Sequence, residues 1–550
     1  MPLFSVTNLR VAVGQHPPRT VVDDISFQVE AGETLAIVGE SGSGKSISLL
    51  TVLGLHPEQA RVSGSVRLED REILGLPARA LRQLRGARFG YVSQDPLSNL
   101  HPQKTVGRQI EEAILAHQRL ARKPLRQRVL DLLNEVGIRD AEKRYHDYPH
   151  QFSGGMRQRV IIAIAIALNP AVIIADEPTT ALDVTVQAAI LALLKKLQQR
   201  HGCALIFISH DLGVVSEIAE RVAVMQHGKI VETGTRQQIY QHPAHPYTRR
   251  LLDAAFHQLP PREQSSEPKT ALLQVSQLAR TFVSRRLWPA KARRNRVLDN
   301  LSFTLHKGEI VGLVGESGSG KTTLGRIVAG LEYADEGQMV FEQTPWQKSG
   351  KRLPVLPPAV RSAIQVIFQD PYTSLNPRRQ VGQILRDPLR IAAQWHENQT
   401  LSDRDLAPQV TQLLAQVELA PEIALRYPNQ LSGGQRQRIA IARALAMRPK
   451  LIVADEAVSA LDITTQYVIV QLLAKLRDQS GLSILFISHD LGIVAALCDQ
   501  ILVLQNGQIV EQGSRDEVFY QPQHAYTRKL LDAIPGNPFP ESQVLTGHYA

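Results

Sequence analysis

A glycine-rich loop of eight residues occurs twice in this chain, as GESGSGKS at residues 39–46 and as GESGSGKT at residues 315–322. Other segments recur with it, since HPYTRRLLDA at residues 245–254 returns as HAYTRKLLDA at residues 524–533. The separation between copies stays nearly constant along both halves, and it is far longer than the repeat of a solenoid. The sequence therefore predicts one domain that is present twice in tandem.

Each half carries the pattern of an α/β domain. Short apolar runs such as TLAIVG, AVIIAD and ALIFISH suit strands that are buried on both faces, and they alternate with segments of helical pattern. We therefore predict, in each half, a mainly parallel sheet core with a helical subdomain and a C-terminal extension. The predicted domains cover residues 1–256 and 271–550, and the stretch rich in Pro, Ser and charge at residues 257–270 is predicted to be a linker.

The composition argues against several classes of protein. The longest apolar run, residues 160–168, is well short of the roughly 20 residues that a membrane-spanning helix needs. The N-terminus lacks the layout of a secretory signal, so we expect the chain to stay in the cytosol. The two cysteines, Cys203 and Cys498, are too few for a disulfide scaffold, a four-cysteine zinc site or a four-cysteine iron–sulfur cluster.

The chain is basic, with a formal net charge of +10. Such a surface can face nucleic acid or an anionic membrane, or it can simply be solvated. Basic side chains are concentrated only at residues 284–296, a run that suits anionic lipid headgroups and a solvated loop equally well. Composition alone therefore does not indicate a nucleic-acid-binding protein.

The two glycine-rich loops have the spacing Gly-x-x-x-x-Gly-Lys-Ser/Thr, and each lies between an apolar strand and a helix. Glycines in this position let backbone N–H groups converge on phosphate oxygens, helped by the start of the helix. We predict that Lys45 and Lys321 reach the β- and γ-phosphates of a nucleoside triphosphate, and that Ser46 and Thr322 ligate Mg²⁺. The other predicted contacts of the loops are Gly39, Ser41, Gly42, Gly44, Gly315, Ser317, Gly318 and Gly320.

An Asp-Glu pair ends a later apolar strand in each half, in AVIIADE and in LIVADE. We predict that Asp176 and Asp455 hold Mg²⁺ through its water shell. Glu177 and Glu456 are placed to polarise the attacking water as general bases. The sequence thus predicts hydrolysis of the bound nucleotide in addition to its binding.

A Ser-Gly-Gly segment stands before a helix in each half, in FSGGMRQR and in LSGGQRQR. A serine hydroxyl next to unblocked N–H groups at a helix start is a second kind of anion site. The residues predicted to contact nucleotide here are Ser153, Gly154, Gly155, Ser432, Gly433, Gly434 and Gln435.

Two further residue pairs complete a specific set of motifs. Gln94 and Gln369 follow apolar strands in YVSQDP and VIFQDP, and His210 and His489 belong to FISHD, which occurs in both halves. With the loops, the Asp-Glu pairs and the Ser-Gly-Gly segments, they resemble the ATPase domain of ABC transporters, over nearly all of residues 3–535.

This resemblance implies a head-to-tail pairing of the two halves, with two ATP molecules in the interface. Lys45 would share its nucleotide with Ser432 and Gly434. The nucleotide at Lys321 would meet the Ser-Gly-Gly that begins at Ser153. Fusion of the halves in one chain would hold each at a high effective concentration for the other.

The resemblance also implies individual roles. His210 and His489 would contact the γ-phosphate during catalysis. Gln94 and Gln369 would contact Mg²⁺ and sense the attacking water, and each begins the segment that touches the membrane subunits in this family.

Other residues have less central implied roles. Asp183 and Asp462 would pass information between the two ATP sites. Phe282 is a candidate for stacking on adenine in the second half, whereas the matching residue of the first half is Val13, which has no aromatic ring. Met156 stands where the second half has Gln435, yet both glutamates are present, so we predict that both sites hydrolyse ATP.

The C-terminal extensions of the halves, with their repeated HPYT and HAYT, resemble the peptide/nickel importer branch of the family, with its two ATPase subunits fused here. This implies two transmembrane permeases and an extracytoplasmic substrate-binding protein as partners. The chain would lie at the cytoplasmic face of the inner membrane. Many relatives of the first subunit carry a cysteine cluster for an iron–sulfur centre, but residues 255–280 contain no cysteine, so we predict no cluster.

Cargo stays open between oligopeptide, dipeptide, glutathione, a peptide antibiotic such as microcin C, and nickel, with peptide favoured. The alternative is a tandem ABC ATPase that acts on ribosomes or nucleic acid. A ribosomal protein of this class would need a long charged helical arm between its halves, and the predicted linker is too short for one. A DNA-repair member would need zinc-binding cysteines, and the two cysteines here are too few. A nucleotide-gated scaffold without catalysis is disfavoured by the glutamates and histidines already named. We therefore expect no nucleic acid among the partners.

Overall fold

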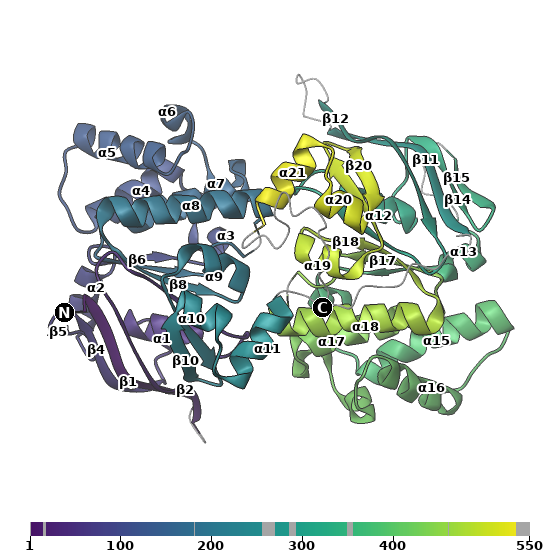
Figure 1. Ribbon diagram of the computed structural model, residues 1–550, viewed down its shortest axis with the longest axis horizontal. Helices are drawn as coiled ribbons and strands as arrows, with labels where there is room; N and C mark the ends of the chain where they lie inside the picture. Colours follow the sequence, from purple (N-terminus) through teal and green to yellow (C-terminus); the bar gives the residue numbers. More distant parts are fainter. Residues whose placement is uncertain are drawn as a thin grey trace, which may run out of the picture. The chain divides into compact units, whose positions relative to one another are not determined.

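The computed structural model of the chain describes residues 2–14, 18–180, 182–255, 270–284, 293–348, 356–459 and 461–534. It divides into two compact units, of which the first contains Met1–Ala255 and the second contains most of the chain that follows (Figure 1). Almost all of the predicted linker and residues 285–292 of the basic run lie outside the described residues. Among the described helices, none has the length and apolar character needed to cross a membrane.

The first unit is built on a six-stranded sheet in the order β10-β9-β3-β8-β7-β6. All neighbours in it are parallel except β10, which pairs antiparallel with β9. The central strand β3, TLAIV, has every residue buried, as expected for a parallel strand covered on both faces. The strands are β3 (Thr34–Val38), β6 (Phe89–Val92), β7 (Val172–Asp176), β8 (Ala204–Ser209), β9 (Arg221–Gln226) and β10 (Lys229–Thr235).

A second sheet of four antiparallel strands, in the order β2-β1-β4-β5, packs on the first through a core of buried aliphatic and aromatic residues. Its strands are β1 (Phe4–Val13), β2 (Arg19–Val29), β4 (Arg61–Leu68) and β5 (Arg71–Glu72). The sequence analysis did not predict this sheet. Asn8, with a φ of 50°, interrupts β1, and the register of β1 shifts on both of its sides.

Most helices of the first unit cover the other face of the parallel sheet, and some of them form the predicted helical subdomain, whereas α1 packs into the core between the two sheets. In Figure 1 α4, α5 and α7 lie together, on the side of the unit away from β1 and β4. The helices are α1 (Lys45–Val52), α2 (Ala78–Leu84), α3 (Pro96–Asn99), α4 (Val106–Leu115), α5 (Arg122–Glu135), α6 (Ala141–Arg144), η1 (Pro149–Gln151), α7 (Gly154–Ile166), α8 (Val184–His201), α9 (Leu212–Ile218), α10 (Arg236–Gln241) and α11 (Pro246–Ala255).

The second unit repeats this plan, which confirms the predicted α/β class. Its sheets run β16-β17-β18-β13-β19-β20 and β12-β11-β14-β15. The strands are β11 (Ala271–Ser284), β12 (Arg293–His306), β13 (Ile310–Val314), β14 (Glu336–Phe341), β15 (Thr344–Lys348), β16 (Ile364–Ile367), β17 (Leu451–Asp455), β18 (Ser483–Ile487), β19 (Gln500–Gln505) and β20 (Gln508–Ser514).

The helices of the second unit follow the same order as those of the first. They are α12 (Lys321–Val328), α13 (Pro358–Ala363), α14 (Pro371–Ser374), α15 (Val381–Glu397), α16 (Asp403–Gln416), η2 (Pro421–Leu425), η3 (Pro428–Gln430), α17 (Gly433–Leu445), α18 (Ile463–Ser480), α19 (Leu491–Leu497), α20 (Arg515–Tyr520) and α21 (Ala525–Asp532).

Candidate functional site

The glycine-rich loop of each unit joins a central parallel strand to a helix: β3 to α1 in the first unit and β13 to α12 in the second. At its start, Gly39 has a φ of +155°, and a Cβ there would lie 2.1 Å from the carbonyl oxygen of Met225. Gly315 is placed alike, with a Cβ that would lie 2.2 Å from the carbonyl oxygen of Leu504. Backbone packing against β9 and β19 therefore requires glycine at these two positions and sets the path of each loop.

The loop lysines are buried and held by the loops themselves. Lys45 is 4% exposed, and its Nζ donates to the carbonyl oxygens of Gly39 at 2.7 Å and Glu40 at 2.8 Å. Lys321 donates in the same way to the loop carbonyls of the second unit, at 2.7 and 3.0 Å. Burial lowers the pKa of Lys45, and the nearby carboxylates of Glu177 and Asp176 oppose this shift. The loop thus orients a cation where the motif predicts phosphate.

The predicted Mg²⁺ ligands of each unit lie against one another. Ser46 donates from Oγ to Oδ1 of Asp176 at 2.9 Å, and Thr322 donates from Oγ1 to Oδ1 of Asp455 at 3.2 Å. Burial raises the pKa of both aspartates. The hydroxyl of Tyr91, which the sequence analysis missed, donates to Oδ2 of Asp176 at 3.1 Å. A hydroxyl beside a carboxylate is a donor set that suits Mg²⁺, so these residues fit the predicted ion.

The glutamate after each aspartate is held by two side chains. Gln94 donates from Nε2 to Oε2 of Glu177 at 2.9 Å, and Nδ1 of His210 lies 3.2 Å from the same oxygen. In the second unit Gln369 donates to Oε2 of Glu456 at 2.7 Å, and Nδ1 of His489 lies 3.6 Å from Oε1. Each predicted Glu–Gln–His group therefore assembles within one unit.

Two further features of the glutamates come from the structure alone. Glu177 and Glu456 have φ values of 46° and 48°, in the left-handed region that non-glycine residues rarely occupy. The hydroxyl of Thr180 also donates to Oε2 of Glu177 at 3.1 Å, whereas Ser459, its counterpart, donates to the backbone oxygen of Glu456. Such backbone strain gathers at functional sites.

The glutamate and the histidine of each group perturb one another. Burial by itself raises the pKa of Glu177, but the hydrogen bond and charge of His210 outweigh it, and the net pKa lies below its ordinary 4.5. Burial lowers the pKa of His210, yet Glu177 and Asp211 raise it above its ordinary 6.5, against the opposing charge of Lys45. Glu456 and His489 shift in the same directions. At neutral pH the glutamates are therefore ionised.

These shifts predict a pH dependence of stability. A raised histidine pKa stabilises the fold fully below pH 6.5 and ceases to do so as the pH rises through the folded-state value. A lowered glutamate pKa stabilises it above pH 4.5 and is lost as the pH falls. The parent chain should therefore exceed its His210→Asn variant in Tm by the largest margin between pH 4.5 and pH 6.5. That difference in Tm should shrink as the pH rises toward about 9. A difference that grows with rising pH would contradict the assignment.

The Ser-Gly-Gly segments begin α7 and α17 as N-caps. Oγ of Ser153 accepts from the N–H of Met156 at 3.4 Å. Oγ of Ser432 accepts from the N–H of Gln435 at 3.2 Å, and Oε1 of Gln435 accepts in return from the N–H of Ser432 at 3.1 Å. Methionine at position 156 therefore removes one half of a capping box. Within the described residues, neither serine hydroxyl reaches the glycine-rich loop of its own unit.

The last glycine of each segment has a packing reason that the sequence analysis missed. A Cβ on Gly155 would lie 2.4 Å from Cγ1 of Val186 in α8, and one on Gly434 would lie 2.4 Å from Cγ2 of Thr465 in α18. Gly154 differs, since a Cβ there would meet Leu182 at an ordinary 3.5 Å.

We expect Gly155→Ala to lower the Tm by roughly 2–10 °C, because the new methyl group overpacks the contact with α8. Gly154→Ala is the matched control and should change the Tm little. Pairing Gly155→Ala with Val186→Ala should restore most of the loss. A Gly155→Ala chain as stable as the parent, in thermal melts followed by circular dichroism, would show that this contact does not constrain the segment.

The remaining predicted residues occupy clear positions. Asp183 stands directly before α8, and Asp462 directly before α18. Phe282 is 38% exposed, and the guanidinium carbon of Arg280 lies 4.5 Å from its ring centroid. The role of Phe282 toward adenine stays a prediction.

The sequence analysis also missed a tyrosine from each C-terminal extension. The hydroxyl of Tyr247 accepts from the N–H of Glu40 at 3.1 Å, and that of Tyr526 accepts from the N–H of Glu316 at 2.9 Å. Glu40 and Glu316 are the second residues of the glycine-rich loops. The signal in the sequence is the repeat of HPYT as HAYT, from which the sequence analysis inferred only the importer branch.

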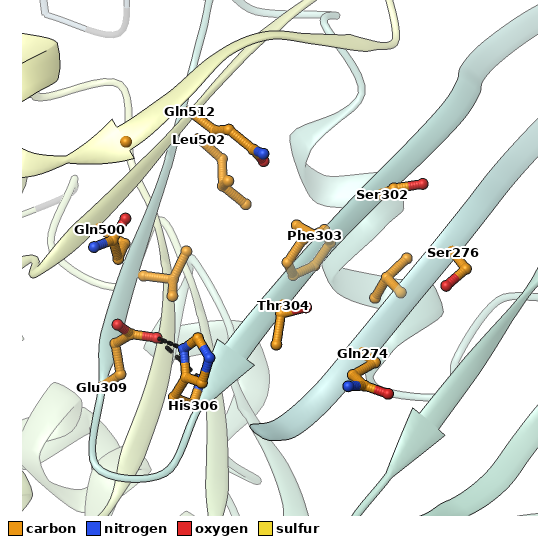
Figure 2. Close-up of a pocket in the computed structure, with 13 residues that line it drawn as sticks. Gln274, Ser276, Ser302, Phe303, Thr304, His306, Glu309, Gln500, Leu502 and Gln512 are labelled. Atoms are coloured by element: carbon orange, nitrogen blue, oxygen red, sulfur yellow. Dashed lines mark hydrogen bonds and ion pairs between the residues drawn. The ribbon is translucent and has the colours of Figure 1, made fainter. Parts of the chain in front are cut away.

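An open groove of about 780 Å³ in the second unit lies away from these residues (Figure 2). One of its lining residues is Glu309, which comes directly before β13. The glycine-rich loop follows β13, so the groove lies at the opposite end of that strand. Figure 2 shows His306 beside Glu309, with Nδ1 2.9 Å from Oε2. In the first unit, the residue that matches Glu309 is Glu33, and its Oε1 accepts from a guanidinium nitrogen of Arg221 at 3.0 Å. The second unit has Gln500 at the position of that arginine. The groove contains no predicted nucleotide contact.

No group of three or more His, Cys, Asp or Glu side chains in the described part of the chain is arranged to hold a metal ion by itself. Cys203 and Cys498 are both buried as free thiols, and burial raises the pKa of each.

Two family models match the sequence. The one described as ABC transporter matches residues 22–180 and 298–459. The one described as oligopeptide/dipeptide transporter, C-terminal region, matches residues 231–286 and 510–547. Each model therefore matches twice, in the same order, and the first match of the second model extends past residue 256 to residue 286.

Curated relatives are similar over almost the whole chain. The "Uncharacterized ABC transporter ATP-binding protein YejF" of Escherichia coli is 45% identical over 533 residues, which cover 96% of this chain and 99% of that protein. The "Peptidoglycan transport ATP-binding protein YejF" of Agrobacterium fabrum is 44% identical, with 97% and 96% covered. The "Glutathione import ATP-binding protein GsiA" of Escherichia coli is 44% identical, with 97% and 89% covered.

Proposed function

Since this chain belongs to the ABC transporter family, with an ATPase domain of that family in each half, we propose that it is the ATP-hydrolysing subunit of an importer for peptides or peptide-like compounds. The observation that carries the proposal is the presence, in both units, of a loop lysine, a hydroxyl–aspartate pair and a Glu–Gln–His group. Relatives named for glutathione import and peptidoglycan transport support cargo with peptide bonds. Glutathione, oligopeptides and cell-wall peptides are the leading candidates.

In this proposal the loop of each half binds the triphosphate of ATP. Lys45 and Lys321 neutralise charge on the β- and γ-phosphates, and backbone N–H groups of the loops complete the cradle. Ser46 with Asp176, and Thr322 with Asp455 in the second half, would hold Mg²⁺, which would supply positive charge to the triphosphate.

Glu177 and Glu456 accept a proton from the attacking water. The water oxygen bonds to the γ-phosphorus, the bond from that phosphorus to the β,γ-bridging oxygen breaks, and ADP leaves with the electron pair. Gln94 and His210 hold the carboxylate of Glu177 by hydrogen bonds, so its orientation is fixed before water arrives. His210 also lies beside the carboxylate that would face the γ-phosphate, so we propose that its imidazole contacts that phosphate during catalysis.

We further propose that each ATP is completed by the Ser-Gly-Gly of the opposite half. Both segments begin helices, where N–H groups without a helical partner can bind an anion, and both serines are exposed. Among the described residues, the hydroxyls of Ser153 and Ser432 bond within their own helix starts. ATP would draw the halves together, hydrolysis would release them, and the movement would be passed to membrane permeases. This gives the chain a place at the cytoplasmic side of a membrane with two permeases and a substrate-binding protein as partners.

The test is reconstitution in proteoliposomes with two permeases and a binding protein of the oligopeptide/dipeptide importer type, from the organism that makes this chain. We expect ATP hydrolysis to rise when binding protein loaded with a peptide or glutathione is added, and labelled cargo to enter with it. Hydrolysis that responds instead to ribosomes or RNA, with no association with permeases, would favour the alternative of a nucleic-acid-linked ATPase.

A further inference from the structure

The tyrosines of the repeated HPYT and HAYT segments are hydrogen-bonded to the glycine-rich loops. Tyr247 is 2% exposed and Tyr526 is 6% exposed, and each belongs to the first turn of the helix that ends the described part of its extension, α11 or α21. The hydroxyl of each accepts from the N–H of the second loop residue, Glu40 or Glu316. A segment more than 200 residues along the chain thus bonds the phosphate-binding loop of the same unit.

The backbone residue whose N–H binds the tyrosine also accepts a hydrogen bond from the loop lysine. Glu40 donates its N–H to Tyr247 and, through its carbonyl oxygen, accepts from Nζ of Lys45 at 2.8 Å. Glu316 serves Tyr526 in the same way, with its carbonyl accepting from Nζ of Lys321 at 3.0 Å. The hydroxyl therefore acts on the ammonium through one backbone residue.

The segment that carries the tyrosine is fixed to its own domain by a glutamate of the preceding strand. Glu232 of β10 accepts from the N–H groups of Ala244 at 2.8 Å and His245 at 3.0 Å, and also from the hydroxyl of Thr248. Nδ1 of His245 accepts from the N–H of Tyr247 at 3.2 Å, which caps the helix start.

The second unit repeats the arrangement. Glu511 accepts from the N–H groups of Gln523 at 2.7 Å and His524 at 3.1 Å, and His524 accepts from the N–H of Tyr526 at 3.2 Å. The histidine and tyrosine of the motif therefore have the same bonded role in both halves, whereas residue 246 is Pro in one copy and residue 525 is Ala in the other.

We propose that Tyr247 and Tyr526 are positioning residues for ATP: each holds the glycine-rich loop in the conformation that presents its lysine, and so sets the affinity of that half for nucleotide. Without the hydroxyl, the loop N–H is buried next to a phenyl ring and its peptide can rotate. Only the fraction of molecules with the correct loop then binds ATP tightly, so the apparent affinity falls by that fraction. This inference rests on the proposed ATPase function and adds a means by which the extension tunes it.

The experiment measures ATP binding and steady-state hydrolysis for the full chain with Tyr247→Phe, Tyr526→Phe and both changes. Phenylalanine keeps the buried ring and removes one hydrogen bond, a loss that corresponds to about a 3- to 10-fold rise in KM for ATP at each altered site. We expect kcat to stay within about twofold, because the Glu–Gln–His groups are untouched. The rise in Tm on addition of ATP should shrink in parallel.

Two controls separate positioning from general stability. Thr248→Val breaks a bond of the same segment to Glu232 without touching the loop, so it should lower the Tm and leave KM unchanged. Tyr145→Phe removes a tyrosine hydroxyl bonded to Glu111 in the helical subdomain and should also leave KM unchanged.

Different results would overturn the proposed ATPase function and the positioning role of the tyrosines. A parent chain that binds no ATP would overturn the proposed function. A parent that binds ATP, with both Tyr→Phe variants matching its KM, would overturn the positioning role alone. Equal changes of KM in the Thr248→Val and Tyr247→Phe chains would also overturn it, because the effect would then follow from loss of local stability.

Discussion

The chain with both Glu177→Gln and Glu456→Gln should bind ATP normally and hydrolyse it at a rate lowered by about 10²–10⁴-fold, the usual contribution of a positioned general base. Glutamine keeps the size of the side chain and its hydrogen-bonding capacity but cannot take the proton of the attacking water. Release of phosphate from radiolabelled ATP measures the rate, and retention of the label after gel filtration measures the trapped nucleotide.

Single replacements refine this result. If each half hydrolyses its own ATP, Glu177→Gln and Glu456→Gln should each lower turnover strongly. Glu135→Gln is a matched control, because Glu135 also pairs with a histidine, His201, at 3.1 Å, but lies outside the candidate site. A double variant that turns over at the parent rate would remove both glutamates as bases.

Lys45→Ala and Lys321→Ala should each reduce ATP hydrolysis by roughly 10²-fold, the scale for removing one donor that meets developing charge. Each lysine is almost fully buried between loop carbonyls, so no neighbouring side chain can replace its ammonium group without rebuilding the loop. Either single change should suffice, because closure of the halves is proposed to need ATP in both sites. ATP affinity at the altered site, measured by equilibrium dialysis, should fall as well.

The control for the lysines is Lys104→Ala, which removes a half-buried lysine whose Nζ lies 2.8 Å from Oε2 of Glu112 on the helical subdomain. That chain should hydrolyse ATP at the parent rate. Hydrolysis at about half of the parent rate in either variant would show that the halves work independently. Near-full hydrolysis would show that the altered half contributes little, and either result would contradict the prediction.

The sequence predicted those features whose chemistry depends on a local motif. The glycine-rich loops, the Asp-Glu strand ends and the Gln and His partners all follow buried parallel strands, and such strands give continuous apolar runs that can be recognised without a structure. Strand ends on one edge of a parallel sheet lie close together. The sequence analysis named the Glu, Gln and His residues separately, and the structure shows that they bond to one another within each unit.

Features that depend on packing between distant segments were not predicted. The antiparallel sheet was missed because left-handed residues, Asn8 in β1 and Gln277 in β11, break the alternation that marks an amphipathic strand. Gly155 was read only as an open N–H donor, although Val186 leaves no room for a side chain. The repeat of HPYT as HAYT singles out Tyr247, but no linear pattern connects that tyrosine with Glu40 of the loop.

The central claim is that each ATP is gripped by the loop lysine of one half and the Ser-Gly-Gly of the other. It is tested most directly by an experimental structure of the Glu177→Gln/Glu456→Gln chain with ATP and Mg²⁺. We predict Oγ of Ser432 within hydrogen-bonding distance of the γ-phosphate at Lys45, and Oγ of Ser153 equally near the γ-phosphate at Lys321. Two fully bound ATP molecules, each contacted by residues of one half alone, would contradict the account.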